Sequence, residues 1–272
     1  MLRCLVIFRV AGATDRGCLV LINRCSADPH DNVALDAALF HALEATGAGE
    51  TLRFWESQGT AVIVGSLGDI PRQVHQDACL RDGVPIIRRL SGGGAVVVTR
   101  GCLNYSLVLS LEARPELRHV ADSYRLILGR IVEALELPGL TIRGQSDLAL
   151  GEQKVSGSAQ RRGRQALLHH GTVLYAFDAR TMERYLQEPE RQPTYRAGRR
   201  HNTFVTNVPL QPDAIKAALI RAWDAEPERS RPDRLATDCN GLRILSGSRR
   251  KEASSAHFMS AGVVSFARGL LT

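Results

Sequence analysis

Apolar and polar positions follow the period of a helix in some segments of the chain and the period of a strand in others, and the helical pattern is the clearer one. Residues 31–45 predict an amphipathic helix, with Asp31 as its N-terminal cap and Gly47 just past its end. Residues 117–137 predict the strongest helix, because apolar residues recur there on one face: Val120, Tyr124, Ile127, Ile131 and Leu135.

Shorter elements fill the rest of the chain. Pro71 predicts the start of a helix that stops near Gly83, and residues 212–225 predict another. Segments rich in β-branched residues predict strands over 52–56, 61–65, 85–90, 95–99 and 103–110, with further short strands after the long helix. This order predicts an α/β fold of the α+β kind, in which helices flank a mixed β-sheet core. Residues 226–255, rich in Arg, Ser, Pro and Asp, predict irregular structure.

Length and composition agree with one folded domain and a small appendage. A chain of 272 residues can bury a full core, and 44% hydrophobic with 23% charged residues is typical of a globular protein in water. No segment approaches the roughly 20 apolar residues of a membrane span. The start of the chain lacks a clear signal-peptide cleavage site, so we expect a cytoplasmic protein with no membrane partner.

The six cysteines have no pair at C-x-x-C spacing, which argues against a zinc site and for free thiols. The net charge of +7 raises the question of nucleic acid, but no aromatic residues interleave with the arginine-rich segments as a stacking surface requires. We therefore expect an acidic partner, a phosphate substrate or a solvated surface, and no nucleic acid.

Lys154 carries more information than any other basic residue. The chain has three lysines against thirty-two arginines, and this lysine opens the segment Lys-Val-Ser-Gly-Ser-Ala-Gln. A lysine ammonium is a compact, mobile point charge, which suits a phosphate or a developing oxyanion better than a planar guanidinium does. We therefore predict a chemical role for Lys154.

A glycine-rich loop precedes it in the sequence. Residues 88–95 read Arg-Arg-Leu-Ser-Gly-Gly-Gly-Ala between two strand-like segments. Three glycines allow positive φ and a close approach of backbone N–H groups to a ligand, and the arginines suit phosphate or carboxylate. A flexible hairpin loop has the same signature. The loop is neither a Walker loop nor a dinucleotide-binding fingerprint, because no Gly-Lys-Thr/Ser follows and no helix starts directly after it.

Four motifs follow one another in order: residues 88–95, Asn104-Tyr105-Ser106, residues 154–160 and His169-His170-Gly171-Thr172. Together they resemble the lipoate-protein ligase A and octanoyltransferase family, which is related to biotin ligases. The resemblance runs over residues 18–210 and includes Asn32-Val33-Ala34-Leu35-Asp36 and Leu52-Arg53-Phe54-Trp55. It implies a biotin/lipoyl protein ligase-like catalytic domain over residues 18–210. Residues 211–272 would be a short C-terminal extension, with the family's accessory domain reduced, absent or supplied by a separate subunit.

The resemblance also implies an activity. The protein would use ATP and Mg to activate lipoate as lipoyl-AMP, and would then transfer the lipoyl group to a lysine of an acceptor protein. The acceptor would be an E2 lipoyl domain, the glycine-cleavage H protein or a lipoate-binding carrier. Preorganised charge dominates such reactions, and Lys154 would bridge the acyl carbonyl and the α-phosphate. The expected substrate- and nucleotide-binding residues are Arg89, Ser91, Gly92, Gly93, Gly94, Ala95, Asn104, Asp147, Ser156, Gly157, Ser158, Ala159, His170, Gly171 and Thr172.

Individual roles follow from the same resemblance. Asp147 follows Gly144-Gln145-Ser146, where many relatives have Arg-Asn before the aspartate. It either holds magnesium or orients the phosphates, or it only caps a turn. We expect Ser91 to be a hydrogen-bonding turn residue and not a nucleophile, and the His-Gly-Thr segment with His170 to position the acyl group. A second polar cluster of Tyr195, Arg196, Arg199, His201 and Asn207 contacts the nucleotide or the carrier protein, or is simply an exposed charged loop.

Two alternatives belong to other classes. An octanoyl or lipoyl transferase from acyl carrier protein works through a cysteine thioester and needs a thiol beside the lysine. No cysteine lies between Cys102 and Cys239, and residues 187–190, where transferases place theirs, read Gln-Glu-Pro-Glu. We expect Cys102 to be a buried small apolar residue. The second alternative is a non-catalytic carrier-binding subunit, against which Lys154 argues.

Overall fold

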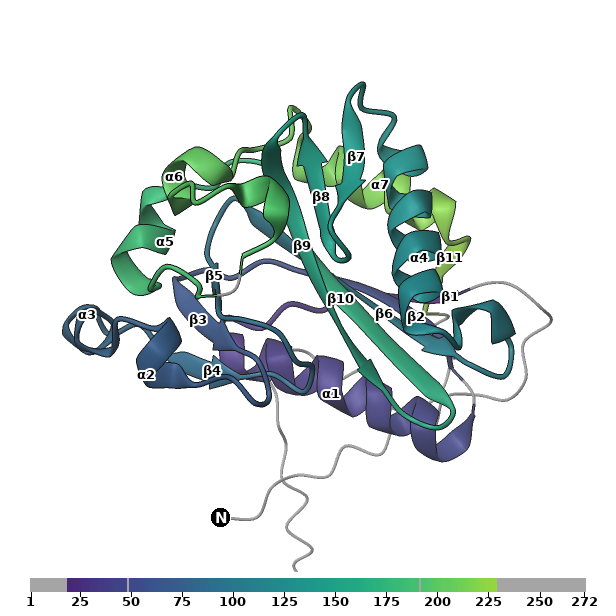
Figure 1. Ribbon diagram of the computed structural model, residues 1–272. Coiled ribbons are helices and arrows are strands. Elements are labelled where there is room, and N and C mark those ends of the chain that lie inside the picture. The colour runs from purple at the N-terminus through teal and green to yellow at the C-terminus, as the bar shows by residue number, and fades with distance from the viewer. Residues whose placement is uncertain (1–18, 48, 191, 229–272) are drawn as a thin grey trace, which may run out of the picture. The chain divides into compact units, whose positions relative to one another are not determined.

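A large mixed β-sheet forms the centre of the chain (Figure 1). The computed structural model describes residues 19–47, 49–190 and 192–228. The sheet has eight strands, in the spatial order β11 (Ala225–Pro227), β1 (Leu19–Ile22), β2 (Thr51–Trp55), β6 (Cys102–Ser110), β10 (Ala166–Leu174), β9 (Gln153–Arg162), β8 (Asp147–Leu150) and β7 (Leu140–Arg143). The first three are parallel to one another, and all later neighbours are antiparallel.

Helices cover both faces of this sheet. Successive residues of a strand point to opposite faces, so Leu167 packs in one core and Leu168 in another. Helix α1 (Pro29–Thr46) packs on β6 and β10 on the Leu168 side, whereas α4 (Val120–Leu135) and α7 (Pro212–Ala222) cover the Leu167 side.

A smaller unit adjoins the large sheet. Strands β4 (Ile86–Arg88), β3 (Ala61–Val64) and β5 (Val96–Val98) form a three-stranded sheet. With it cluster four short helices: α2 (Ile70–Gln73), α3 (Gln76–Asp82), α5 (Arg180–Tyr185) and α6 (His201–Phe204). Their apolar residues form one core together with Trp55, Cys102 and Leu174 of the large sheet. A pocket lies between this unit and the large sheet. The predicted mixed sheet flanked by helices is therefore confirmed.

Several predicted boundaries are wrong in detail. Asp28, and not Asp31, caps α1: its carboxylate accepts from the His30 backbone N–H at 2.8 Å, and Pro29 opens the helix. Gly47 ends α1 as predicted, with φ of 70°. The helix predicted from Pro71 is two helices, because Val74 between them is extended and bridges to Leu186.

The long helix α4 begins at Val120, after a 3-10 turn at Pro115–Leu117. Val120 is 46% exposed and does not belong to the apolar face, whereas Ile127, Ile131 and Leu135 are buried. Strands β9 and β10 carry the later motifs and have ten and nine residues, so they are not short.

The C-terminal part of the described chain differs most from the prediction. Helix α7 ends at Ala222, and Ala225 begins β11, which pairs in parallel with β1. Neither strand is predicted from the sequence. Helix α7 packs on α4, so residues 211–228 of the predicted extension belong to the same compact unit as the residues before them. The rest of that extension, including residues 229–255 predicted as irregular, lies outside the described residues. Within the described ranges, no helix is both long enough and apolar enough to cross a membrane.

Candidate active site

A cavity of about 970 Å³ lies between the large sheet and the smaller unit. Its floor comes from β9 and β10, and its sides come from α1, the glycine-rich loop and residues 186–205. Most of the expected site residues line it: Arg89, Gly93, Gly94, Ala95, Asn104, Asp147, Lys154, Ser156, Gly157, Ser158, Ala159, His170, Gly171 and Thr172. Ser91 and Gly92 are not among its lining residues.

Lys154 reaches this cavity from β9 and is held by a carboxylate. Its Nζ lies 2.7 Å from Oδ1 of Asp147, and its side chain is 28% exposed. Gly157 provides the necessary space, because a Cβ there would lie 2.8 Å from the Lys154 Nζ. The strand therefore presents one ammonium, fixed in place and open to a ligand.

Asp147 is the residue that fixes this lysine. It is buried, it begins strand β8, and its Oδ2 accepts a hydrogen bond from the Tyr195 hydroxyl at 2.9 Å. Since it lies in a strand and its side chain binds Lys154 and Tyr195, the turn-cap interpretation is wrong. Both carboxylate oxygens are engaged, and the described residues contain no group of three His, Cys, Asp or Glu that could hold a metal ion. These residues do not fit a magnesium ion held by the protein alone.

The glycine-rich loop is built by its two arginines. Arg89 is buried and donates from Nε to Ser91 Oγ and from Nη2 to the carbonyls of Gly92 and Gly94, at 2.6 to 3.0 Å. Burial lowers the pKa of Arg89 to about 10, so it stays charged at neutral pH. Arg88 holds the neighbouring loop in the same way, through the carbonyls of residues 65, 66 and 68. The guanidinium groups of Arg88 and Arg89 therefore stabilise the two loops. The predicted contact of Arg89 with phosphate stays a prediction.

Replacing Gly93 with valine is expected to weaken binding of both acyl substrate and nucleotide without unfolding the protein. Gly93 has φ of 92°, and a Cβ there would lie 2.9 Å from Arg89 Nη2. A branched residue resists this backbone conformation and displaces the arginine that holds the loop. Titration calorimetry with each ligand measures the effect. Gly92→Val is the matched control, because a Cβ at Gly92 meets nothing within 4 Å. Loss of the circular dichroism spectrum would show instead that the loop is only structural.

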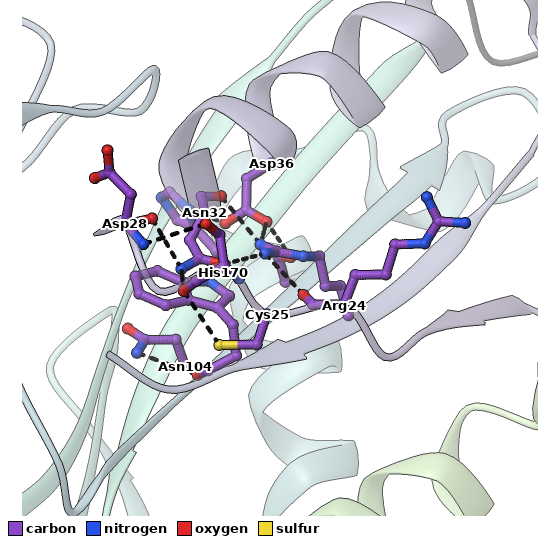
Figure 2. Close-up of polar contacts among 11 residues, drawn as sticks. Arg24, Cys25, Asp28, Asn32, Asp36, Asn104 and His170 are labelled. Atoms are coloured by element: carbon purple, nitrogen blue, oxygen red, sulfur yellow. Dashed lines mark hydrogen bonds and ion pairs between the residues drawn. The ribbon is translucent and has the colours of Figure 1, made fainter. Parts of the chain in front are cut away.

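A network of polar side chains lies at the α1 side of the cavity (Figure 2). Asp36 Oδ1 accepts from Arg53 Nη1 at 2.6 Å and from Ser106 Oγ at 2.8 Å, and its Oδ2 lies 3.8 Å from His170 Nδ1. On the other side of the ring, His170 Nε2 is 2.6 Å from Ser91 Oγ. Burial pushes the pKa of Asp36 upward, but His170, Arg53 and Ser106 together outweigh it and lower that pKa.

This network gives Ser91 and His170 their roles. Ser91 is fully buried and is bonded by Arg89 and His170, so it is the hydrogen-bonding residue that the sequence predicts and not an exposed nucleophile. His170 lies between Asp36 and the loop, which fits a positioning role. Asp36 and Arg53 belong to this network although the sequence motifs do not single them out as site residues. Asn32 and Asp36, polar residues four apart on the apolar face of the predicted helix, are the sequence signal for Asp36, and Arg53 is the one charged residue of the segment 52–55.

The residues of the second polar cluster, predicted around residues 195–207, have different surroundings. Arg196 and His201 are buried and line the cavity, so an exposed charged loop is the wrong interpretation for them. Asn207 instead bonds the backbone N–H and carbonyl of Phe177.

The described part of the chain contains three cysteines: Cys25, Cys79 and Cys102. Cys79 and Cys102 are buried in the core of the smaller unit, and burial raises the pKa of Cys102 to about 12. Cys25 is exposed. None of the three is a lining residue, and all three are free thiols. Cys102 is therefore the buried apolar residue that the sequence predicts.

The cavity combines apolar lining residues, a buried polar network at one side and one carboxylate-held lysine, an arrangement that suits a ligand with an apolar part and a charged end. Comparisons with known proteins give the family. Residues 28–222 match the family described as "Lipoyl protein ligase A/B catalytic domain". The chain belongs to this family and is an enzyme of it.

Some of the individual relatives are named as lipoate-protein ligases and others as octanoyltransferases. "Putative lipoate-protein ligase A" of Aeropyrum pernix is 30% identical over 76% of this chain and 75% of its own length. "Octanoyltransferase LipM" of an Exiguobacterium species is 29% identical over 58% of this chain and 66% of its own length. A bi-partite lipoate protein ligase of Thermoplasma acidophilum, whose structural study includes its E2 lipoyl domain, has the same fold. Its TM-score is 0.66 at 22% identity, over 79% of this chain and 87% of that one.

Proposed function

We propose that this protein is an ATP-dependent lipoate-protein ligase that forms lipoyl-AMP and transfers the lipoyl group to a lysine of an acceptor protein. The observation that carries the proposal is Lys154, an ammonium in the cavity with its carboxylate partner at 2.7 Å, together with no cysteine among the described residues that line it. A lysine alone can serve an adenylate, whereas a thioester needs a thiol within reach.

The chemistry of the first step sets what the site must do. An oxygen of the lipoate carboxylate attacks the α-phosphorus, the bond from that phosphorus to the bridging oxygen breaks, and pyrophosphate leaves with the electron pair. Two anions have to approach each other, so a fixed cation between them lowers the barrier. Lys154 would supply it, while the apolar walls would hold the acyl chain. In the second step the neutral amine of the acceptor lysine attacks the acyl carbonyl and forms the amide. The acyl–oxygen bond of the anhydride breaks, AMP leaves with its electron pair, and the amine proton passes to solvent.

The identity of the acceptor protein, the need for an accessory subunit and the cellular location are further predictions. An E2 lipoyl domain, the glycine-cleavage H protein and a lipoate-binding carrier all present a lysine that suits this chemistry. The bi-partite organisation of the Thermoplasma ligase supports looking for a separate accessory subunit. A cytoplasmic location stays a prediction. Any magnesium would have to come with the triphosphate, because Asp147 is already engaged.

The direct test is mass spectrometry of a lipoyl domain incubated with the protein, lipoate and Mg-ATP. We expect a lipoyl adduct only when the nucleotide is present, with release of pyrophosphate in step with the adduct. An adduct formed from octanoyl acyl carrier protein without nucleotide would contradict the ligase and support a transferase, the second candidate that the match to an octanoyltransferase favours.

Removing the thiols is expected to leave the ligase active. A variant with all six cysteines replaced by alanine should retain ATP-dependent lipoylation, because no covalent thioester is formed. Alanine is chosen because a serine hydroxyl at the fully buried Cys102 would have to find a partner in an apolar core. If the variant folds, as judged by its circular dichroism, but loses all acyl transfer, the thioester alternative is the better explanation.

A further inference from the structure

Four described residues that line the cavity carry a fixed positive charge: Arg72, Arg89, Lys154 and Arg196. Arg89 is engaged by the loop that it holds, and Arg72 lies at the rim, where its side chain is 69% exposed and near Asp69 and Glu190. A triphosphate carries more negative charge than the Lys154 ammonium alone can balance. Arg196 is the remaining cation of this set inside the cavity.

The surroundings of Arg196 hold its guanidinium in one orientation. Its Nε donates to the Arg199 carbonyl at 2.8 Å, and Arg199 Nε donates back to the Arg196 carbonyl at 3.1 Å. Its Nη2 donates to Glu188 Oε2 at 2.5 Å, and its guanidinium carbon lies 4.8 Å from the centre of the Phe204 ring. A guanidinium that is already oriented by a carbonyl, a carboxylate and an aromatic face loses little entropy when it binds an anion.

Arg196 is also connected to the lysine. The preceding residue, Tyr195, donates its hydroxyl to Asp147, which in turn binds Lys154. Lys154 and Arg196 both line the cavity, and each is paired with a carboxylate, Asp147 and Glu188 respectively. Tyr195 links the two pairs, because it precedes Arg196 in the chain and its hydroxyl donates to Asp147. The Glu188 side chain is 46% exposed, so it can turn to water when an anion replaces it.

We propose that Arg196 binds the phosphate groups of the nucleoside triphosphate on the leaving-group side of the α-phosphorus, an inference that rests on the proposed function. Lys154 faces the bond that forms, and Arg196 takes up the charge that grows on pyrophosphate as the other bond breaks. Glu188 holds Arg196 in the meantime and is exchanged for phosphate oxygens. An arginine suits this task because its planar fork binds two phosphate oxygens at once.

Binding of ATP to the full chain, measured by titration calorimetry, tests the inference. Arg196→Gln should weaken ATP binding about 30-fold, the loss of a charge-assisted pair of hydrogen bonds. Lipoate binding should not change. Transfer from preformed lipoyl-AMP to a lipoyl domain should also remain, because pyrophosphate has already left. Arg180→Gln is the matched control, since Arg180 is a highly exposed arginine of the adjacent helix α5 and pairs only locally with Asp178.

A double variant separates phosphate binding from a structural ion pair. If Arg196 serves only to neutralise Glu188, Arg196→Gln combined with Glu188→Gln should restore ATP affinity. If Arg196 binds phosphate, the double variant should stay as weak as the single one. Restored affinity, unchanged affinity in Arg196→Gln, or an equal loss of transfer from lipoyl-AMP would each overturn the inference.

A failure of the proposed ligase function gives a different result from a failure of the Arg196 inference. If the native protein binds ATP and Arg196→Gln weakens that binding, but no pyrophosphate is released with lipoate, the ligase proposal fails while the phosphate site stands. If the native protein binds no ATP, both fall together.

Discussion

Replacing Lys154 with alanine is expected to abolish lipoyl-AMP formation, lowering its rate at least about 100-fold, the scale of losing one preorganised charge at a developing anion. Lys154→Arg should restore little. The ammonium fits between Asp147 and the bare backbone of Gly157, and a larger planar guanidinium cannot occupy the same position without moving one of them. Pyrophosphate release in the presence of lipoate and Mg-ATP measures the rate.

Lys216→Ala is the matched control, because this lysine lies on α7 and is not among the described residues that line the cavity; it pairs with Asp213. Both lysine variants should keep the circular dichroism spectrum of the native protein. An arginine variant with near-normal turnover would contradict the assigned role, since it would show that any cation at this position suffices.

The sequence predicts this fold well wherever local rules decide it. The αL glycine at 47 and the apolar face of α4 are set by backbone conformation and by periodicity within one segment. Strands β1 and β11 depend on distant partners. They have four and three residues; β1 pairs with β2 and β11, and β11, at the sheet edge, pairs with β1 from about two hundred positions further along the chain. No short window of sequence contains that information.

The candidate site shows the same difference between what local sequence predicts and what depends on distant residues. Lys154, Gly93 and His170 are marked by composition and by motif order, and all three line the cavity. The function of a charge depends on its partners, which come from distant segments. Arg89 is next to the glycines in sequence, but its donors are directed at loop carbonyls. Arg196 lies in what looks like a solvated segment, yet it is buried because Glu188 and Phe204 pack around it. Residue type predicts the charge, whereas burial and pairing decide its use.

His169 is expected to make the protein less stable in acid. It is fully buried on the face of β10 opposite to His170, and burial, with a smaller contribution from His170, lowers its pKa to about 3 from an ordinary 6.5. Its Nε2 faces the Tyr105 hydroxyl, and its Nδ1 faces the Gln160 amide nitrogen at 3.0 Å. The Gln160 oxygen already accepts from Ser123 and Arg162, so the amide cannot turn to accept a second ring proton.

The sign of the effect follows from proton binding. Because the folded-state pKa is depressed, the unfolded chain takes up a proton at a pH where the folded chain does not, so stability is complete above about pH 6.5 and falls as the pH approaches 3. At pH 5 this one residue should lower the free energy of unfolding by about 2 kcal/mol relative to pH 8. Buried Asp36, whose pKa is lowered, adds to the loss at still lower pH.

Urea unfolding at a series of pH values measures this effect in the native protein and in His169→Gln, whose neutral amide can face Tyr105 and Gln160 without titrating. The variant should be less sensitive to acid than the native protein by about 2 kcal/mol between pH 8 and pH 5, even if its stability at pH 8 is lower. His41→Gln, at an exposed position of α1, should follow the native curve. If the curves of the native protein and His169→Gln run parallel, His169 takes up its proton without cost in the folded state and the buried neutral imidazole is not what limits stability in acid.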